Sequence, residues 1–373
     1  MKHRRNSSIE LLKLITIIII VIGHSFPSNL YLSAETAGKW FIDLNIASSN
    51  INNIVLIVYS NFFNFANTLF VICSAYFLID NEKVSLKKIF YMIMDTWAIS
   101  IFFLILTLLF RYEVNIKLLI KQLFPILFQN NWFVTCYIMF YILHPVLNMV
   151  VKRLKQRELL QLNIILFILY CCIYTLLHND IFYNNLVGFI IIYLFVSYVK
   201  LYMPAFSKDT KRNVMLLIIS SILNFLLSLS VIFIGLKVPM FKDNMHHFAI
   251  VINPLYLIMS ISLFNLFKNR EFYNKKINYF SSLSLLIYLF SENILFKRSF
   301  FRDIYTYIYN TYTYRNIIPI IAVMAGLLLI ISTSLAVLYK EVFQNKLHNI
   351  GFKVLKFPKK IFEGITDKLI EIV

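Results

Sequence analysis

The sequence predicts an all-α, polytopic integral membrane protein with about ten transmembrane helices. Hydrophobic residues make up 60% of the 373 residues and charged residues only 14%. Only seven glycines and eight prolines interrupt the apolar runs. A soluble domain carries about 25% charged residues, because its surface faces water. Most of the surface of this chain must therefore face lipid, which excludes a soluble globular protein.

Apolar runs long enough to cross a bilayer recur along the chain as far as residue 339. A helix rises about 1.5 Å per residue, so about 20 apolar residues span a hydrocarbon core of about 30 Å. We expect a transmembrane domain over residues 1–345 and a cytoplasmic amphipathic tail over 346–373, where Lys alternates with apolar residues. The predicted spans are residues 9–28, 54–79, 89–110, 132–151, 160–178, 182–201, 214–236, 247–267, 279–296 and 317–339.

The first apolar run resembles a secretory signal peptide, because Lys2, Arg4 and Arg5 precede it. It nevertheless contains Glu10 and Lys13 and lacks a small-residue cleavage site. We therefore expect it to remain in the protein as the first helix.

The distribution of positive charge predicts how the spans are oriented. If the N-terminus lies in the cytoplasm, 25 of the 36 Lys and Arg residues fall in cytoplasmic segments and 10 in external ones. Cytoplasmic loops of membrane proteins carry such an excess. The sequence thus predicts an even number of spans with both termini in the cytoplasm. The net charge of +18 reflects this topology, and we expect no nucleic-acid partner.

The cysteine and histidine pattern predicts no metal site. The four cysteines lie in or against apolar runs without the paired spacing of metal ligands, which favours apolar packing. His246 and His247 lie at the outer end of the eighth predicted span, and no third ligand is near them in the sequence. The cysteines are Cys73, Cys136, Cys171 and Cys172.

The first helix carries three ionisable residues, Glu10, Lys13 and His24. Eleven residues separate Lys13 from His24, so at about 100° per residue the two share one face, and Glu10 lies within about 60° of Lys13. The imidazole is then roughly 16 Å farther along the helix than the ammonium. Ionisable groups inside a span need a partner or a function. This stripe predicts a polar path through the helix bundle.

Two interpretations of these residues stay open. Glu10 and Lys13 could form an ion pair at the membrane interface, and His24 could be an interfacial residue bonded to a backbone carbonyl. Alternatively, His24 is a general base, because imidazole titrates near neutral pH and can accept a proton from a hydroxyl.

Further polar residues lie within the predicted spans. Glu292 is an intramembrane carboxylate in the ninth span and a natural partner for Lys13 or His24. Trp132 opens the fourth span, where an aromatic anchor is expected at the outer interface. For the amides and hydroxyls we expect interhelical hydrogen bonds. They are Asn61, Asn64, Asn67, Ser74, Asn253, Ser291 and Asn293.

Four stretches together resemble one known family. They are residues 5–14 (RNSSIELLKL) leading to Gly23-His24-Ser25, residues 70–78 (FVICSAYFL), residues 131–141 (NWFVTCYIMFY) with Pro145 and Asn148, and residues 287–293 (IYLFSEN). In this order, on a ten-span plan from residue 5 to about residue 345, they resemble the membrane-bound acyltransferase family 3. Members of that family O-acylate bacterial cell-surface polysaccharides.

The chain departs from the family pattern at four places. Lys13 stands where the family usually has arginine, which keeps the positive charge but loses bidentate geometry. Ala75 replaces a glycine and Ser291 replaces a late histidine. The basic patch that often contains two arginines is reduced to Lys87-Lys88.

The resemblance implies an O-acyltransferase of the bacterial plasma membrane. Its donor would be a cytoplasmic acyl-CoA, with acetyl-CoA expected, and its acceptor a hydroxyl of a surface polysaccharide or lipid-linked precursor. His24 would deprotonate the hydroxyl or relay the acyl group, Lys13 would orient the donor, and Glu10 would keep Lys13 charged. The implied partners are the acyl-CoA donor, the glycan acceptor and membrane lipid, with no metal. The implied substrate-binding residues are Trp132, Tyr137, Ser291, Glu292 and Asn293.

Two other functions would also need a polar path. A flippase or transporter for lipid-linked oligosaccharide is the main alternative, although the sequence lacks an inverted repeat and its histidine lies near the outer mouth. A glycan polymerase usually carries a large external loop. The longest external segments here, residues 29–53 and 297–316, are short.

Overall fold

The computed structural model confirms the all-α class. Its described residues form helices joined by turns and short connections, without any β-strand in these ranges. The described residues are 6–25, 62–177, 184–238, 252–301 and 317–351, together with residues 55, 58, 303, 304 and 307.

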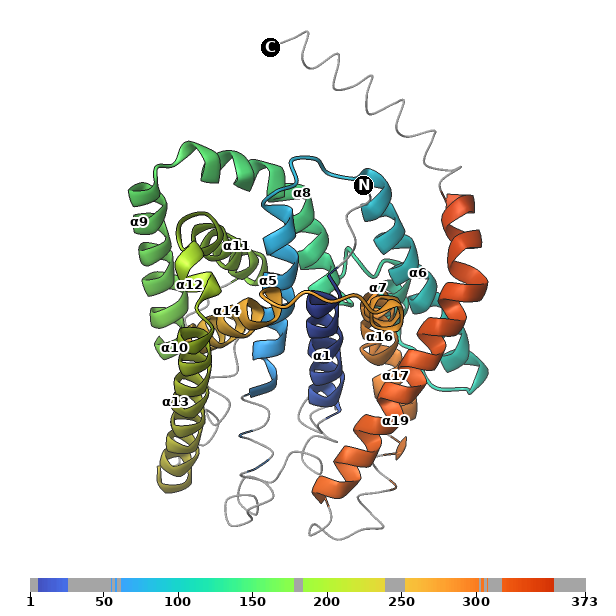
Figure 1. The fold of residues 1–373 in the computed structure, drawn as a ribbon. Coiled ribbons are helices and arrows are strands. Elements are labelled where there is room, and N and C mark those ends of the chain that lie inside the picture. Colours follow the sequence, from blue (N-terminus) through green and yellow to red (C-terminus); the bar gives the residue numbers. More distant parts are fainter. Residues whose placement is uncertain are drawn as a thin grey trace.

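Figure 1 shows the described helices gathered in one bundle. Three segments, named η2, η5 and η7, have the wider π-helical winding. In chain order the elements are α1 (Ser7–His24), α5 (Phe65–Leu78), α6 (Leu86–Leu109), α7 (Ile116–Leu123), α8 (Trp132–Arg153), α9 (Gln156–Leu166), η2 (Phe167–Ile173), α10 (Tyr174–Leu177), α11 (Asn185–Tyr202), α12 (Pro204–Lys208), α13 (Thr210–Lys237), α14 (Pro254–Lys268), α15 (Lys275–Ser281), α16 (Ser284–Ser291), α17 (Ile294–Phe296), η5 (Lys297–Phe301), α19 (Ile317–Leu338) and η7 (Tyr339–Gln344).

The structure does not confirm the predicted count of ten spans. Among the described residues, seven helices are long and apolar enough to cross a membrane, or eight if the bent pair Lys275–Ser281 and Ser284–Phe296 forms one span. The predicted spans 54–79 and 247–267 correspond to two shorter apolar helices, α5 with 14 residues and α14 with 15. The multi-pass membrane architecture itself follows from these helices.

Helix α1 lies in the middle of the bundle (Figure 1). It packs against α5 and α14 on one side and against α15, α16 and α19 on the other. Asn6 caps its N-terminus, because the side chain accepts a hydrogen bond from the Ser8 amide at 2.9 Å. The Ser7 amide donates to the Phe272 carbonyl at 2.9 Å, which fixes the start of α1 to the segment before α15. Most of α1 is therefore surrounded by protein.

The corner between α5 and α8 is held by Asn148, one of the residues in the third family-like stretch. Its side-chain amide donates to the carbonyls of Leu78 and Asn81 at 3.1 and 2.8 Å, and its oxygen accepts from the Tyr193 hydroxyl. Carbonyls at a helix C-terminus lack partners within the helix, and Asn148 supplies them for α5. This residue thus fixes the relative positions of α5, α8 and α11.

The C-terminal helix runs farther than the sequence predicts. Helix α19 continues through η7 as one helix, Ile318–Gly351, of 34 residues. The predicted boundary between the transmembrane domain and the tail, at residues 345 and 346, falls inside this helix. The rest of the predicted tail, residues 352–373, lies outside the described residues.

A buried carboxylate joins this helix to α6. Asp95 is 4% exposed and accepts hydrogen bonds from the Tyr339 hydroxyl at 2.8 Å and the Gln344 amide at 2.9 Å. The His348 Nε2 atom lies 2.8 Å from the same carboxylate, and the Tyr91 ring stacks on the imidazole at 3.8 Å. Three side chains of the C-terminal helix thus converge on one acidic residue.

Replacing Asp95 with Ala should destabilise the fold, because three side chains, one buried and two partly buried, lose their hydrogen-bond partner. We expect a loss of about 1–3 kcal/mol in the free energy of unfolding. The measurement is thermal unfolding of the purified protein in detergent, with Glu82→Ala as the control. Glu82 is an exposed carboxylate paired with Lys152, and its loss should change stability little. Equal stability of Asp95→Ala and wild type would contradict this role.

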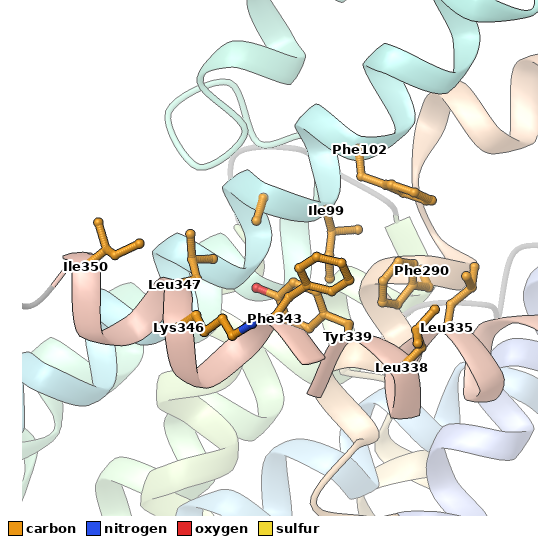
Figure 2. A pocket seen from close by; sticks show the side chains of 11 residues that line it. Ile99, Phe102, Phe290, Leu335, Leu338, Tyr339, Phe343, Lys346, Leu347 and Ile350 are labelled. Atoms are coloured by element: carbon orange, nitrogen blue, oxygen red, sulfur yellow. The ribbon is translucent and has the colours of Figure 1, made fainter. Parts of the chain in front are cut away.

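An apolar groove lies beside the Asp95 cluster, between α6, α16 and the C-terminal helix (Figure 2). Its volume is about 370 Å³, and Ile99, Phe102, Phe290 and Leu335 are among its walls. Apart from Lys346 and the Tyr339 hydroxyl, its side chains are aliphatic or aromatic. It offers no set of groups for acid–base or nucleophilic chemistry.

Candidate active site

The candidate active site is a polar pocket of about 410 Å³ at the C-terminal end of α1. Its walls come from α1, the start of α5 and the residues before it, helix α7, the start of α8 and the residues before it, and the region where α16 gives way to α17 and η5. The pocket therefore draws on segments from both halves of the chain. Its imidazole and charged groups are His24, Lys121, Glu292 and Lys297.

His24, Glu292 and Lys297 form an ionic cluster. The His24 Nδ1 atom lies 2.6 Å from Glu292 Oε1. The Lys297 ammonium lies 2.8 Å from the same oxygen and donates to Glu292 Oε2 at 2.9 Å. The side chains are only 12%, 11% and 2% exposed, respectively. The Glu292 carboxylate thus lies between the imidazole and the ammonium and contacts both.

A helix break places the two charged residues on the pocket. Helix α16 ends at Ser291, and Asn293 starts α17 by accepting hydrogen bonds from the amides of Leu295 and Phe296 at 2.9 and 3.4 Å. Glu292 lies in the break itself. Lys297 follows one turn later and reaches back to the carboxylate. Asparagine favours such caps because its side chain replaces the missing helical acceptor.

Aromatic rings hold the imidazole of His24 in place. The Phe63 ring meets it edge-on at 5.2 Å between centroids, and the Tyr288 ring lies at 6.4 Å. Gly23 makes this approach feasible, because a Cβ atom at that position would overlap the Phe63 ring. Gly23 thus has a steric role next to His24.

Glu10 and Lys13 form a second cluster near the other end of α1. Their side chains are 3.5 Å apart, and Glu10 also accepts a hydrogen bond from the Ser281 hydroxyl at 2.6 Å. The Lys13 ammonium lies 5.4 Å from the centroid of the Phe77 ring. Glu292, predicted as a partner for Lys13 or His24, contacts His24. The three ionisable residues of α1 therefore belong to two separate sites.

Some of the predicted substrate-binding residues line the pocket, and the others lie outside its lining. Trp132 and Glu292 line the pocket. Ser291 is buried with its hydroxyl bonded to the Tyr288 carbonyl at 3.2 Å, and Asn293 is the α17 cap. Neither of them lines the pocket. Tyr137 is also outside it and stacks with Tyr141, at 6.4 Å between ring centroids.

The polar wall contains residues that the sequence analysis missed. The charge pattern of the sequence assigns Lys297 to an external segment. It nevertheless lies five residues after the intramembrane Glu292, close enough along a helix for the two side chains to meet. Lys121 comes from the short helix α7, and no sequence motif indicates that it belongs to the site. Asn64 and Asn67 were expected to bond other helices but line the pocket. Asn61, His246 and His247 lie outside the described residues.

Buried amides in this wall have unused hydrogen-bonding capacity. Both side-chain polar atoms of Asn130, and Nδ2 of Asn131, have no hydrogen-bond partner within the described part of the chain. Buried polar groups are nearly always paired in proteins, so such atoms mark a surface suited to a polar ligand. In the same ranges, no three His, Cys, Asp or Glu side chains converge as a metal site would require.

The acyltransferase domain family known as acyltransferase 3 matches residues 6–339, nearly the whole chain. The chain belongs to this family. It is therefore a membrane acyltransferase. No curated protein and no solved structure matches it.

The family assignment confirms the resemblance found in the sequence and gives no support to a flippase or transporter. The match includes His24, Glu292 and Lys297 and ends at Tyr339. Gln344 and His348, which bind Asp95, lie beyond it. The ionic cluster thus belongs to the family domain, whereas two of the Asp95 contacts come from the segment that follows.

Replacing Glu292 alone should destabilise the protein strongly, because the Lys297 ammonium would stay buried without its counter-ion. We expect Glu292→Gln to cost about 3–5 kcal/mol in unfolding free energy. The double variant Glu292→Gln/Lys297→Met removes both charges and should recover most of that loss. Unfolding of the purified variants in detergent measures both effects. Losses that simply add in the double variant would contradict the pairing.

Proposed function

We propose that this acyltransferase moves a short acyl group from a cytoplasmic acyl-CoA to a hydroxyl of a cell-surface polysaccharide or its lipid-linked precursor. The observation that carries the proposal is the His24–Glu292 contact in a polar pocket. The proposal places the protein in a bacterial plasma membrane with both termini in the cytoplasm. The excess of Lys and Arg on that side supports this orientation.

His24 acts as the general base. The Glu292 carboxylate lies 2.6 Å from Nδ1, and a proton on Nδ1 would leave Nε2 as the nitrogen available to a substrate. A carboxylate next to imidazole also stabilises the imidazolium that forms when the proton is taken, as in other acyl transfer enzymes. An unactivated alcohol is a poor nucleophile, so this step is needed at neutral pH.

The reaction then balances with no further reagent. The acceptor hydroxyl loses its proton to His24 Nε2 while its oxygen forms a bond to the thioester carbonyl carbon. The carbon–sulfur bond of the acyl-CoA breaks, and the departing thiolate takes the proton from the imidazolium. The products are an ester and free CoA, and His24 returns to its neutral form.

The composition of the pocket supports a sugar acceptor. Sugar hydroxyls both donate and accept hydrogen bonds, and so do side-chain amides. Aromatic rings such as Trp132 add an apolar surface for a sugar face. Five amide side chains line the pocket, including the unpaired ones of Asn130 and Asn131. They are Asn64, Asn67, Gln129, Asn130 and Asn131.

A small cavity beside the pocket supports a short acyl chain. It measures about 20 Å³, and its lining includes Ile17, Ile20 and Phe133. It shares Asn67 and Tyr288 with the larger pocket. A space of this size holds about one water-sized group. The methyl group of an acetyl thioester fits it, whereas longer chains do not.

Glu10 and Lys13 lie on the side from which the donor enters in this proposal. The Lys13 ammonium provides a positive charge there and pairs with Glu10 at 3.5 Å. Lys87 and Lys88, near the start of α6, add positive charge that attracts the phosphates of CoA. These residues orient the donor and do not take part in proton transfer.

Replacing His24 with Ala should reduce acyl transfer by about 10²–10⁴-fold, the range of general base catalysis. The assay follows transfer of labelled acetyl from acetyl-CoA into glycan by membranes containing the protein. Ser25→Ala is the matched control, because it changes the next residue, which does not line the pocket. Full activity of a correctly inserted His24→Ala variant would overturn the proposed function.

Shortening Ile20 should let the enzyme accept a longer donor. Ile20→Val adds space for one methyl group to the small cavity, at a cost in stability of about 0.5–1.5 kcal/mol. We expect the rate with propionyl-CoA relative to acetyl-CoA to rise about tenfold, the scale of discrimination for one methylene. Ile19→Val, on the same helix but outside the cavity, should leave the ratio unchanged. An unchanged ratio in Ile20→Val would contradict the assignment of this cavity.

A further inference from the structure

The charged residues that line the candidate pocket include more positive than negative groups. Glu292 is the only carboxylate in the described lining, and Lys297 contacts both of its oxygens. Lys121 lines the same pocket, is half-buried, and forms no ion pair with any described carboxylate. With neutral His24, one positive charge therefore remains uncompensated in the pocket. A positive charge in a partly enclosed site attracts anions more strongly than one in open water.

The amino end of a long helix adds to this positive potential. Helix α8 has 22 residues and begins at Trp132 on the pocket wall. The first amides of a helix lack intrahelical acceptors and carry a partial positive charge. Asn131 occupies the N-cap position, but its side chain makes no capping hydrogen bond. The Val134 amide donates to the Asn131 backbone carbonyl at 3.1 Å, so the Trp132 and Phe133 amides are the ones left without a helical acceptor at this end of α8.

The side chain of Asn131 provides independent support for a ligand. It is 3% exposed and lines the pocket, and its Nδ2 donor has no partner among the described residues. A buried donor without a partner costs free energy, which a bound acceptor would recover. An ammonium, an amide donor and a helix amino end are the groups that bind phosphates and carboxylates in proteins.

We propose that this part of the pocket binds an oxyanion, a phosphate or carboxylate carried by one of the two substrates. Lys121, the Asn131 amide and the amino end of α8 hold it. The inference rests on the proposed function in taking the pocket as a substrate site, and it narrows the substrate class. The anionic group belongs either to an acidic or phosphorylated glycan acceptor or to the phosphates of CoA, and the second source would place the donor's phosphates in this pocket instead of beside Lys87 and Lys88.

Binding to the purified full-length protein in detergent tests the proposal without turnover. Glucose 1-phosphate against glucose probes the acceptor as source, and CoA against pantetheine, which lacks the nucleotide phosphates, probes the donor. Titration calorimetry should show at least one anionic probe binding about tenfold more tightly than its neutral counterpart. This preference should weaken as salt rises, because ions screen the partly exposed Lys121.

Two variants and a control identify the groups involved. Lys121→Gln should remove the roughly tenfold preference for the anionic probe, and Asn131→Asp should remove it by adding a negative charge. Lys117→Gln, one turn away on α7 and exposed, should retain it. Loss of the preference for glucose 1-phosphate assigns the anion to the acceptor, and loss of that for CoA assigns it to the donor.

Either of two results would overturn the proposal: equal binding of anionic and neutral probes by the wild type, or wild-type preference in both Lys121→Gln and Asn131→Asp. These results are distinguishable from failure of the proposed function. Acyl transfer that persists in His24→Ala would remove the catalytic assignment. Anion binding that is independent of Lys121, in a protein whose activity requires His24, would remove the oxyanion site alone.

Discussion

The contact of Glu292 with both His24 and Lys297 is the constraint on which the rest of the site depends. Isolated charges are costly inside a membrane protein, so each of these groups needs the others. To bring them together, the chain breaks the α16 helix at Glu292 and restarts it with the Asn293 cap. Gly23 lets an aromatic ring close on the imidazole. The helix break, the packing around the imidazole and the ion pair thus all fix the same arrangement of His24, Glu292 and Lys297.

The polar groups of the protein form three clusters that differ in their surroundings. At one end of α1 a carboxylate and an ammonium form a simple pair, and at the other end an imidazole is oriented by a carboxylate and adjoins a wall of amides. The Asp95 cluster is a third polar centre, but its donors and acceptors are satisfied within the protein. A satisfied cluster stabilises, whereas a cluster with unused donors and acceptors can bind. This contrast distinguishes the polar groups that stabilise the fold from those that can bind a ligand.

Much of this architecture could be predicted from the sequence, and the exceptions have physical reasons. Apolar runs and the charged stripe on α1 depend on local periodicity, so the all-α class, the membrane character and the Glu10–Lys13 pair were predictable. The count of about ten spans is not confirmed, because hydropathy does not show that α5 and α14 contain 14 and 15 helical residues in the described ranges. Lys297 and Lys121 join the pocket through tertiary packing, which a single sequence does not encode locally. Ser291 and Asn293 were adjacent to the right residue, but helix geometry turns them away from the pocket.

The small cavity between the two polar ends of α1 has a consequence for the cell as well as for the acyl chain. A continuous file of water joining Lys13 to His24 would conduct protons across the bilayer and dissipate its electrochemical gradient. The aliphatic and aromatic collar around Ile17, Ile20 and Phe133 leaves space for about one water molecule. In this conformation the collar interrupts such a file. The protein can therefore hold ionisable groups at both ends of α1 with little room, at this cavity, for a proton-conducting file of water.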